Sequence, residues 1–129
     1  GIYSVSDENA KKGIRHITSA LDKVMNIQGV TYTYDDQKFN GKIPEDNRLH
    51  YGFLAQNIEQ VLPEAVSSKN IRFQNPIQKK RSTLEESGKM ANVKAVNYQA
   101  IIPVLVEAIK EQQSQIETLK IAVERLKKQ

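Results

Sequence analysis

The sequence contains no cysteine and no tryptophan among its 129 residues. The lack of cysteine excludes disulfide bonds and thiolate metal sites, and it leaves the redox compartment of the protein open. Long hydrophobic runs are also absent, because no stretch approaches the roughly 18 apolar residues that a membrane-spanning helix needs. No signal-peptide pattern is visible either. We therefore expect no membrane among the partners of this chain.

Sites for metals and nucleotides are equally poorly supported. The chain has two histidines, His16 and His50, and neither belongs to a His/Asp/Glu set with metal-ligand spacing. No G-x-x-x-x-G-K pattern is present to hold a nucleotide phosphate. We expect His16 on the surface, and we predict neither a metal nor a cofactor.

Positive charge is in small excess, with 19 Lys and Arg against 15 Asp and Glu. The one tight basic cluster is Lys79–Arg81, and two glutamates follow it closely. A nucleic-acid surface requires a basic stripe interleaved with aromatic residues. This sequence lacks one, so we expect no nucleic-acid partner. A nucleic-acid-binding module remains an alternative that rests on net charge alone.

The chain has the length of one ordinary domain, and its pattern predicts an α+β head. An amphipathic helix is expected to begin near Asp7 and Glu8 and to end before Gly29. The apolar residues that predict this helix are Ile14, Ile17, Leu21 and Val24. Alternating residues 30–34 predict a strand, and residues 93–98 predict a further one. Between them, Ile58, Val61 and Leu62 predict a short helix ended by Pro63. The range 67–92 is the least regular, and we interpret it as a loop or hairpin arm.

A heptad repeat occupies the C-terminal third of the chain, so we divide the protein into a head, residues 1–98, and a helix, residues 99–129. The core positions of the repeat are Ile102, Leu105, Ile109, Gln112, Ile116, Leu119, Val123 and Leu126. A continuous helix here is about 40 Å long, so its distal end should project from a head of roughly 30 Å. A projecting apolar stripe needs partner helices, which predicts a self-associating coiled coil rather than a helix folded back onto its head.

The number of strands in this coiled coil is less clearly specified. β-branched residues at the a positions with leucine at d favour a dimer. However, Val106 at an e position and Ala108 and Ala122 at g positions widen the apolar stripe, which favours three helices. Gln112 would place a polar layer in the core of the coiled coil. Such a layer lowers the stability of the coil but specifies the alignment of its helices.

The N-terminal stretch SDENAK offers two interpretations. Ser6 or Asp7 is well suited to cap a helix. Alternatively, Ser6 is a nucleophile whose proton is taken by Lys11, five residues later. On a regular helix these two side chains would not share a face, so they can meet only if Ser6 lies in the turn before the helix. The two interpretations are compatible with each other.

Four ordered blocks resemble the endosialidase-type intramolecular chaperone domain found at the ends of phage tail spikes, tail fibres and neck appendages. SDENAKKGI is similar to its opening S-D-x-R-x-K-x-x-I, and LDKVMNIQGVTYTY to its helix-then-strand block. HYGFLAQNIEQVLPEAV resembles its H-x-G-x-x-A-Q…P-E signature, and VNYQAIIPVLVEAIKEQQSQIETLK its closing tyrosine block and coiled coil. The resemblance covers nearly the whole chain apart from residues 67–92.

This resemblance implies a homotrimer in which each chain ends in one helix of a three-stranded coil. It implies that the domain promotes folding of an upstream β-rich fibre segment of the same polypeptide and then cuts itself off. Ser6 matches the nucleophile and Lys11 the activating lysine, with the cut at Val5–Ser6. Asp7, His50 and Gln56 would have supporting roles. Asn9 departs from the family pattern, which has arginine at this position.

The implied site of action is the host cytoplasm during virion assembly, with the domain released from the mature virion protein. A permanent trimerisation cap of a fibre or surface adhesin, without proteolysis, is the alternative, and it would place the protein at a bacterial cell surface. In either case we expect a small mixed helix and strand head followed by a long C-terminal helix.

Overall fold

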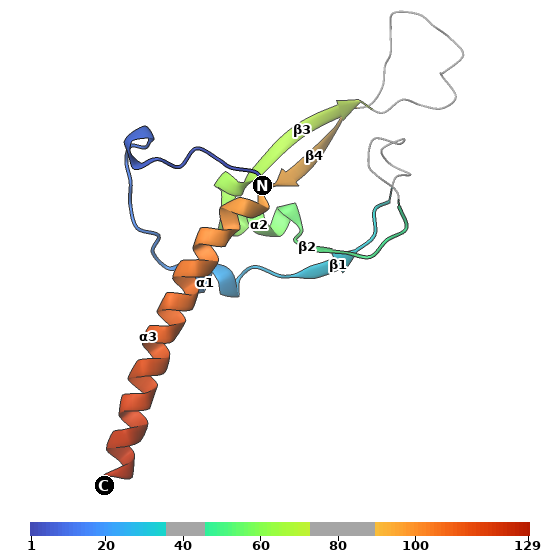
Figure 1. Ribbon diagram of the computed structural model, residues 1–129. Coiled ribbons are helices and arrows are strands. Elements are labelled where there is room, and N and C mark those ends of the chain that lie inside the picture. Colours follow the sequence, from blue (N-terminus) through green and yellow to red (C-terminus); the bar gives the residue numbers. More distant parts are fainter. Residues whose placement is uncertain (36–45, 73–89) are drawn as a thin grey trace, which may run out of the picture.

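The computed structural model describes residues 1–35, 46–72 and 90–129. A single long helix, α3 (Ile101–Lys127), projects from a small head of short helices and strands (Figure 1). The predicted mixed head with a long C-terminal helix is therefore confirmed. The distal half of α3 extends well beyond the head in Figure 1, so the alternative of a helix folded back onto its own head is wrong.

Apart from its short 3₁₀ helices, the head is assembled from α-helices and strands in the order helix, strand, strand, helix, strand, strand. Its elements are η1 (Glu8–Ala10), α1 (Ala20–Met25), β1 (Val30–Tyr32), β2 (His50–Gly52), α2 (Ala55–Val61), η2 (Pro63–Ala65), β3 (Val66–Arg72), β4 (Met90–Val96) and η4 (Tyr98–Ala100).

The strands form two separate antiparallel pairs. β1 pairs with β2, placing Val30 opposite Gly52 and Tyr32 opposite His50. β3 pairs with β4 from Val66 opposite Val96 outward, so the strand predicted near residue 93 is confirmed. These two strands occupy both ends of the range 67–92, while residues 73–89 and the basic cluster at 79–81 lie outside the described residues.

Two small apolar clusters hold the head to the base of α3. In the first, Ala20 of α1 packs against Val104 and Ala108 of α3, and these three residues are at most 4% exposed. In the second, Ile58 of α2 and Ala65 pack against Ile101 at the start of α3, with Leu62 contributing to both clusters. Alanines at the α1–α3 contact allow the two helices to approach closely. The core therefore lies where α3 begins.

The N-terminal helix is much shorter than predicted. Helix α1 spans Ala20–Met25, whereas the sequence pattern predicts a helix beginning near Asp7. Gly13 has φ +66° and Ser19 has φ +55°, and such left-handed residues interrupt a right-handed helix. Ile17 packs on the core, but Ile14 is two-thirds exposed. The regular spacing of apolar residues that predicted the long helix therefore corresponds to core contacts only from Ile17 onward.

Glu111 of α3 caps α1 across a separation of about 90 residues. Its carboxylate accepts hydrogen bonds from the backbone N–H groups of Ala20 (2.9 Å) and Leu21 (3.1 Å). Ser19 precedes the helix without a side-chain cap of its own. The first N–H groups of a helix need acceptors, and a negative charge there also favours the helix dipole. Glu111 of α3 therefore provides the N-terminal cap of α1 that Ser19 does not provide.

We expect Glu111→Gln to lower the free energy of unfolding by about 1–2 kcal/mol, because only one oxygen and no charge then faces the two N–H groups. Glu107→Gln is the matched control, since the partner of Glu107 among the described residues is Lys110, one turn along the same helix. That control should change stability by less than about 0.5 kcal/mol. Urea unfolding at a fixed protein concentration measures both values. Equal shifts in the two variants would contradict the capping role.

Candidate active site

The N-terminal arm, residues 1–19, contains one tight turn. The 3₁₀ helix η1 is closed by backbone hydrogen bonds from Ala10 N to Asp7 O (3.0 Å) and from Lys11 N to Glu8 O (3.2 Å). Asp7 is the N-cap, with extended backbone angles, and its carboxylate accepts a hydrogen bond from Asn9 N at 2.8 Å. Of the two predicted caps, Asp7 rather than Ser6 has this role. Ser6 lies just before the turn.

This turn brings the two predicted catalytic side chains together. Lys11 Nζ lies 2.7 Å from Ser6 Oγ and donates a hydrogen bond to it. The geometry meets the condition set by the sequence, because the chain reverses over one turn instead of continuing as a regular helix. When the amine is neutral, the same contact allows the hydroxyl to donate its proton to nitrogen. The structure therefore places the two predicted residues in direct hydrogen-bond contact.

The pair is open to water in the single chain. Every residue from 1 to 19 except Ile17 is exposed. The arm loops out to one side of the head and returns at α1 (Figure 1). Val5, immediately before Ser6, is 86% exposed. The contact between Ser6 and Lys11 is in place, while the chain's own head does not shield it from water.

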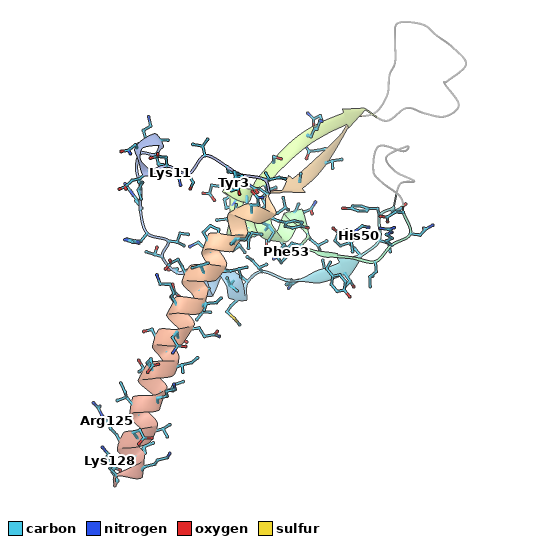
Figure 2. All side chains as sticks on the ribbon, viewed as in Figure 1. Tyr3, Lys11, His50, Phe53, Arg125 and Lys128 are labelled. Carbon is cyan, nitrogen blue, oxygen red and sulfur yellow. The ribbon has the colours of Figure 1, made fainter. Side chains whose placement is uncertain are left out.

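His50 belongs to a different cluster, on β2. Its Nε2 atom lies 3.0 Å from Asp46 Oδ1 and 3.1 Å from Oδ2, and its ring stacks on Tyr32 at 5.5 Å. Bonding to His50, and then to the N–H of Arg48, lowers the pKa of the Asp46 carboxyl from its ordinary value. Lys11 and His50 lie on opposite sides of the molecule in Figure 2. One chain does not bring His50 to the Ser6–Lys11 pair.

The remaining predicted supporting residue, Gln56, is exposed in the first turn of α2. Its neighbour Asn57 instead connects two parts of the head. Asn57 Oδ1 accepts a hydrogen bond from Gln28 N (2.9 Å), and its Nδ2 donates to Asn26 O (3.0 Å). Asn57 thereby fixes the turn between α1 and β1. Sequence reasoning missed this residue, because an isolated asparagine on a helix has no characteristic local pattern.

A mainly apolar pocket of about 540 Å³ lies beside β1 and β2. Its lining residues are Gly29, Val30, Thr31, Tyr51, Gly52, Phe53 and Tyr98. Phe53 N donates a hydrogen bond to Tyr98 Oη (3.2 Å), and a Cβ atom at Gly52 would clash with that hydroxyl oxygen. Glycine at position 52 therefore lets the closing tyrosine block reach β2. The sequence did not predict this pocket.

The predicted seam of α3 is uncovered. Ile101, Val104 and Ala108 face the head, and the a and d residues lie on a neighbouring face about a quarter turn away. The exposed apolar members of the seam are Ile102, Leu105, Ile109, Ile116, Leu119, Val123 and Leu126, with relative exposures of 40–68%. Gln112, the polar member, is exposed as well.

One detail of the seam prediction needs correction. Ala108 does not widen the apolar stripe, because it is buried against α1. Val106 and Ala122 remain exposed beside the seam. Ala108, at a g position of the heptad, therefore packs on the head instead of on a partner helix. The heptad pattern alone could not indicate this contact.

Metal binding and membrane spanning find no support in the described residues. Within the ranges 1–35, 46–72 and 90–129, no group of three or more His, Asp or Glu side chains is placed to hold a metal ion. No helix in the same ranges is both long enough and apolar enough to cross a membrane.

Comparison with known proteins gives a family match that begins at Ser6 itself. Residues 6–67 match a family that is described as "Chaperone of endosialidase". The name of the same family classifies it as a peptidase. The chaperone-of-endosialidase segment contains Ser6, Lys11, His50 and Gln56, and the resemblance predicted from the sequence is confirmed.

Two curated relatives extend the match toward the C-terminus. They are the proteins named "Long tail fiber protein Gp37" from Enterobacteria phages K3 and T2, each 32% identical over 118 residues, or 92% of this chain. The chain spans only 8% and 7% of their respective lengths.

A solved structure shares the fold. It is described as "a novel intramolecular chaperon" and superposes with a TM-score of 0.59 at 17% identity, covering 85% of this chain and 99% of the other. The long helix beyond the chaperone-of-endosialidase segment is thus part of a known architecture.

Proposed function

We propose that this chain is an intramolecular chaperone that trimerises and promotes folding of an upstream β-rich phage fibre or appendage segment of the same polypeptide. It then releases itself by serine–lysine autoproteolysis next to Ser6. The observation that carries this proposal is the 2.7 Å contact between Lys11 Nζ and Ser6 Oγ. The match of residues 6–67 to a family named both as a chaperone and as a peptidase supports it, as does the similarity to the tail-fibre proteins. The action takes place in the host cytoplasm during virion assembly.

The proposed cut uses the bond directly before the nucleophile. Neutral Lys11 takes the proton from Ser6 Oγ, and the oxygen attacks the carbonyl carbon of Val5. The C–N bond between Val5 and Ser6 breaks, and the leaving nitrogen takes the proton from Lys11. Water then hydrolyses the resulting ester, leaving a carboxylate on Val5 and a free amine and hydroxyl on Ser6. No separate substrate site is needed for such a single-turnover reaction.

Assembly is the proposed trigger for this reaction. An amine surrounded by water keeps its proton near neutral pH, and a protonated amine cannot accept another. The Ser6–Lys11 pair is exposed in the single chain, as is the apolar Val5 before it. Covering of the arm by neighbouring copies or by the folded client would remove water and free the base. Cutting would then follow folding.

The exposed seam of α3 supports self-association through the long helix. Its seven apolar side chains do not pack on the head, and a sustained stripe of this kind is stable in water only when another helix covers it. Three copies are proposed because the family resemblance implies a homotrimer and because Val106 and Ala122 widen the stripe.

Trimerisation before client folding has a physical advantage. Three separate chains that must intertwine pay a large association cost and face a register problem. Once the helices have joined, pairing of the upstream segments occurs at an effective concentration of about millimolar. Removal of the chaperone afterwards leaves the fibre kinetically trapped in its folded state.

The deciding experiment uses a chain extended by about 50 or more native upstream residues, enough for a small folded unit. On a denaturing gel, the wild type should give two bands and Ser6→Ala one. Ser4→Ala, two residues upstream, is the matched control and should give two. Two bands from Ser6→Ala would remove Ser6 from the mechanism. One band from every variant would favour a permanent trimerisation cap without proteolysis.

A further inference from the structure

The turn that joins Ser6 to Lys11 is held by hydrogen bonds from Asn9 to the capping carboxylate of Asp7. Asn9 N donates to Asp7 Oδ1 at 2.8 Å, and Asn9 Nδ2 donates to the same oxygen at 3.2 Å. One residue therefore supplies two donors to the capping carboxylate. The side-chain donor is the one that depends on the identity of residue 9.

This turn has little else to stabilise it. Helix η1 is three residues long and contains no buried residue. A single turn fixes several backbone dihedrals for very few hydrogen bonds, so its population in water is low unless side chains cap it. The side-chain hydrogen bonds shown for residues 6–11 are the two nitrogens of Asn9 to Asp7 and Lys11 to Ser6. Opening of the turn would separate Lys11 from Ser6.

We propose that Asn9 is a positioning residue for the Ser6–Lys11 pair. Its side-chain amide completes the Asp7 cap, the cap keeps η1 closed, and the closed turn holds Lys11 Nζ against Ser6 Oγ. The consequence for cutting rests on the proposed function, while the consequence for the turn does not.

The first test measures the first-order rate of self-cleavage in the extended chain. Asn9→Asp keeps the shape of the side chain but replaces its donor with a carboxylate facing Asp7, so the rate should fall about tenfold or more. Asn9→Arg restores a donor and should cleave within about threefold of the wild type. Glu8→Gln changes charge in the same turn without removing a hydrogen bond shown for these residues, and should stay within about twofold of wild type.

The second test does not require cutting. In the 129-residue chain, an NMR cross-relaxation signal between the Hε protons of Lys11 and the Hβ protons of Ser6 should be present in the wild type, Asn9→Arg and Glu8→Gln. It should be lost in Asn9→Asp. The thermal midpoint should be the same in all four proteins, because the turn contributes no buried residue to the core.

The outcomes separate this inference from the proposed function. Retention of the proton contact in Asn9→Asp would overturn it, as would wild-type cleavage by that variant. Slow cleavage by both Asn9→Asp and Asn9→Arg would also overturn it, because a restored donor would then have failed to rescue the rate. If the extended wild type does not cut, the proteolytic proposal fails, and the proton contact alone decides whether Asn9 positions the pair.

Discussion

Leu119→Asp is expected to convert the proposed trimer into a monomer. Leu119 occupies a d position in the middle of the distal half of α3, beyond the head, and is 64% exposed in the single chain. In a three-stranded coil this change would bury three carboxylates in one apolar layer, without partners. The cost of burying unpaired charges far exceeds what one layer of leucine contributes. Light scattering coupled to size exclusion measures the mass directly.

Thr118→Asp is the matched control for this change. It introduces the same carboxylate one residue earlier, at a c position that faces away from the seam. We expect it to retain the oligomer. A trimer that survives Leu119→Asp would mean that the head, rather than α3, holds the chains together.

Lys11→Met in the extended chain is expected to slow self-cleavage by about 10²–10⁴-fold, the usual contribution of a general base. Methionine keeps the length and the apolar stem of lysine but cannot take a proton from Ser6 Oγ. Lys11→Arg should be nearly as slow, because a guanidinium holds its proton at every accessible pH. The rate of appearance of the shorter band on a denaturing gel measures all variants.

Lys12→Met provides the control, since it removes the same charge from the next residue, whereas the contact to Ser6 comes from Lys11. It should cleave close to the wild-type rate. Normal cleavage by Lys11→Met would show that another group activates Ser6. Equal slowing by both variants would indicate that the net charge of the arm, rather than a positioned base, controls the reaction.

Local sequence was sufficient for the features that depend on neighbouring residues. The heptad stripe of α3 follows from a repeated spacing, and in the structure the helix has that stripe exposed. The approach of Lys11 to Ser6 depends on a turn of a few residues whose capping carboxylate, Asp7, is also local. The ordered blocks that resemble the chaperone family were likewise visible without coordinates.

Other features depended on contacts between distant parts of the chain. The pattern of apolar residues predicted a long N-terminal helix, but only the part beginning at Ala20 has α3 to pack against. Its cap, Glu111, comes from about 90 residues away, and Ala108 is withdrawn from the seam by the same contact. The family resemblance implies a supporting role for His50, yet β2 carries it to the side of the molecule opposite Lys11 (Figure 2).

The division has a single physical reason. Periodicity and capping record what a segment prefers by itself, so the sequence alone determined the projecting helix, its apolar stripe and the serine–lysine spacing. A six-residue helix such as α1 is too short to be stable without tertiary contacts. Where it begins, what caps it and which face of α3 it covers were therefore decided only when the chain folded back on itself.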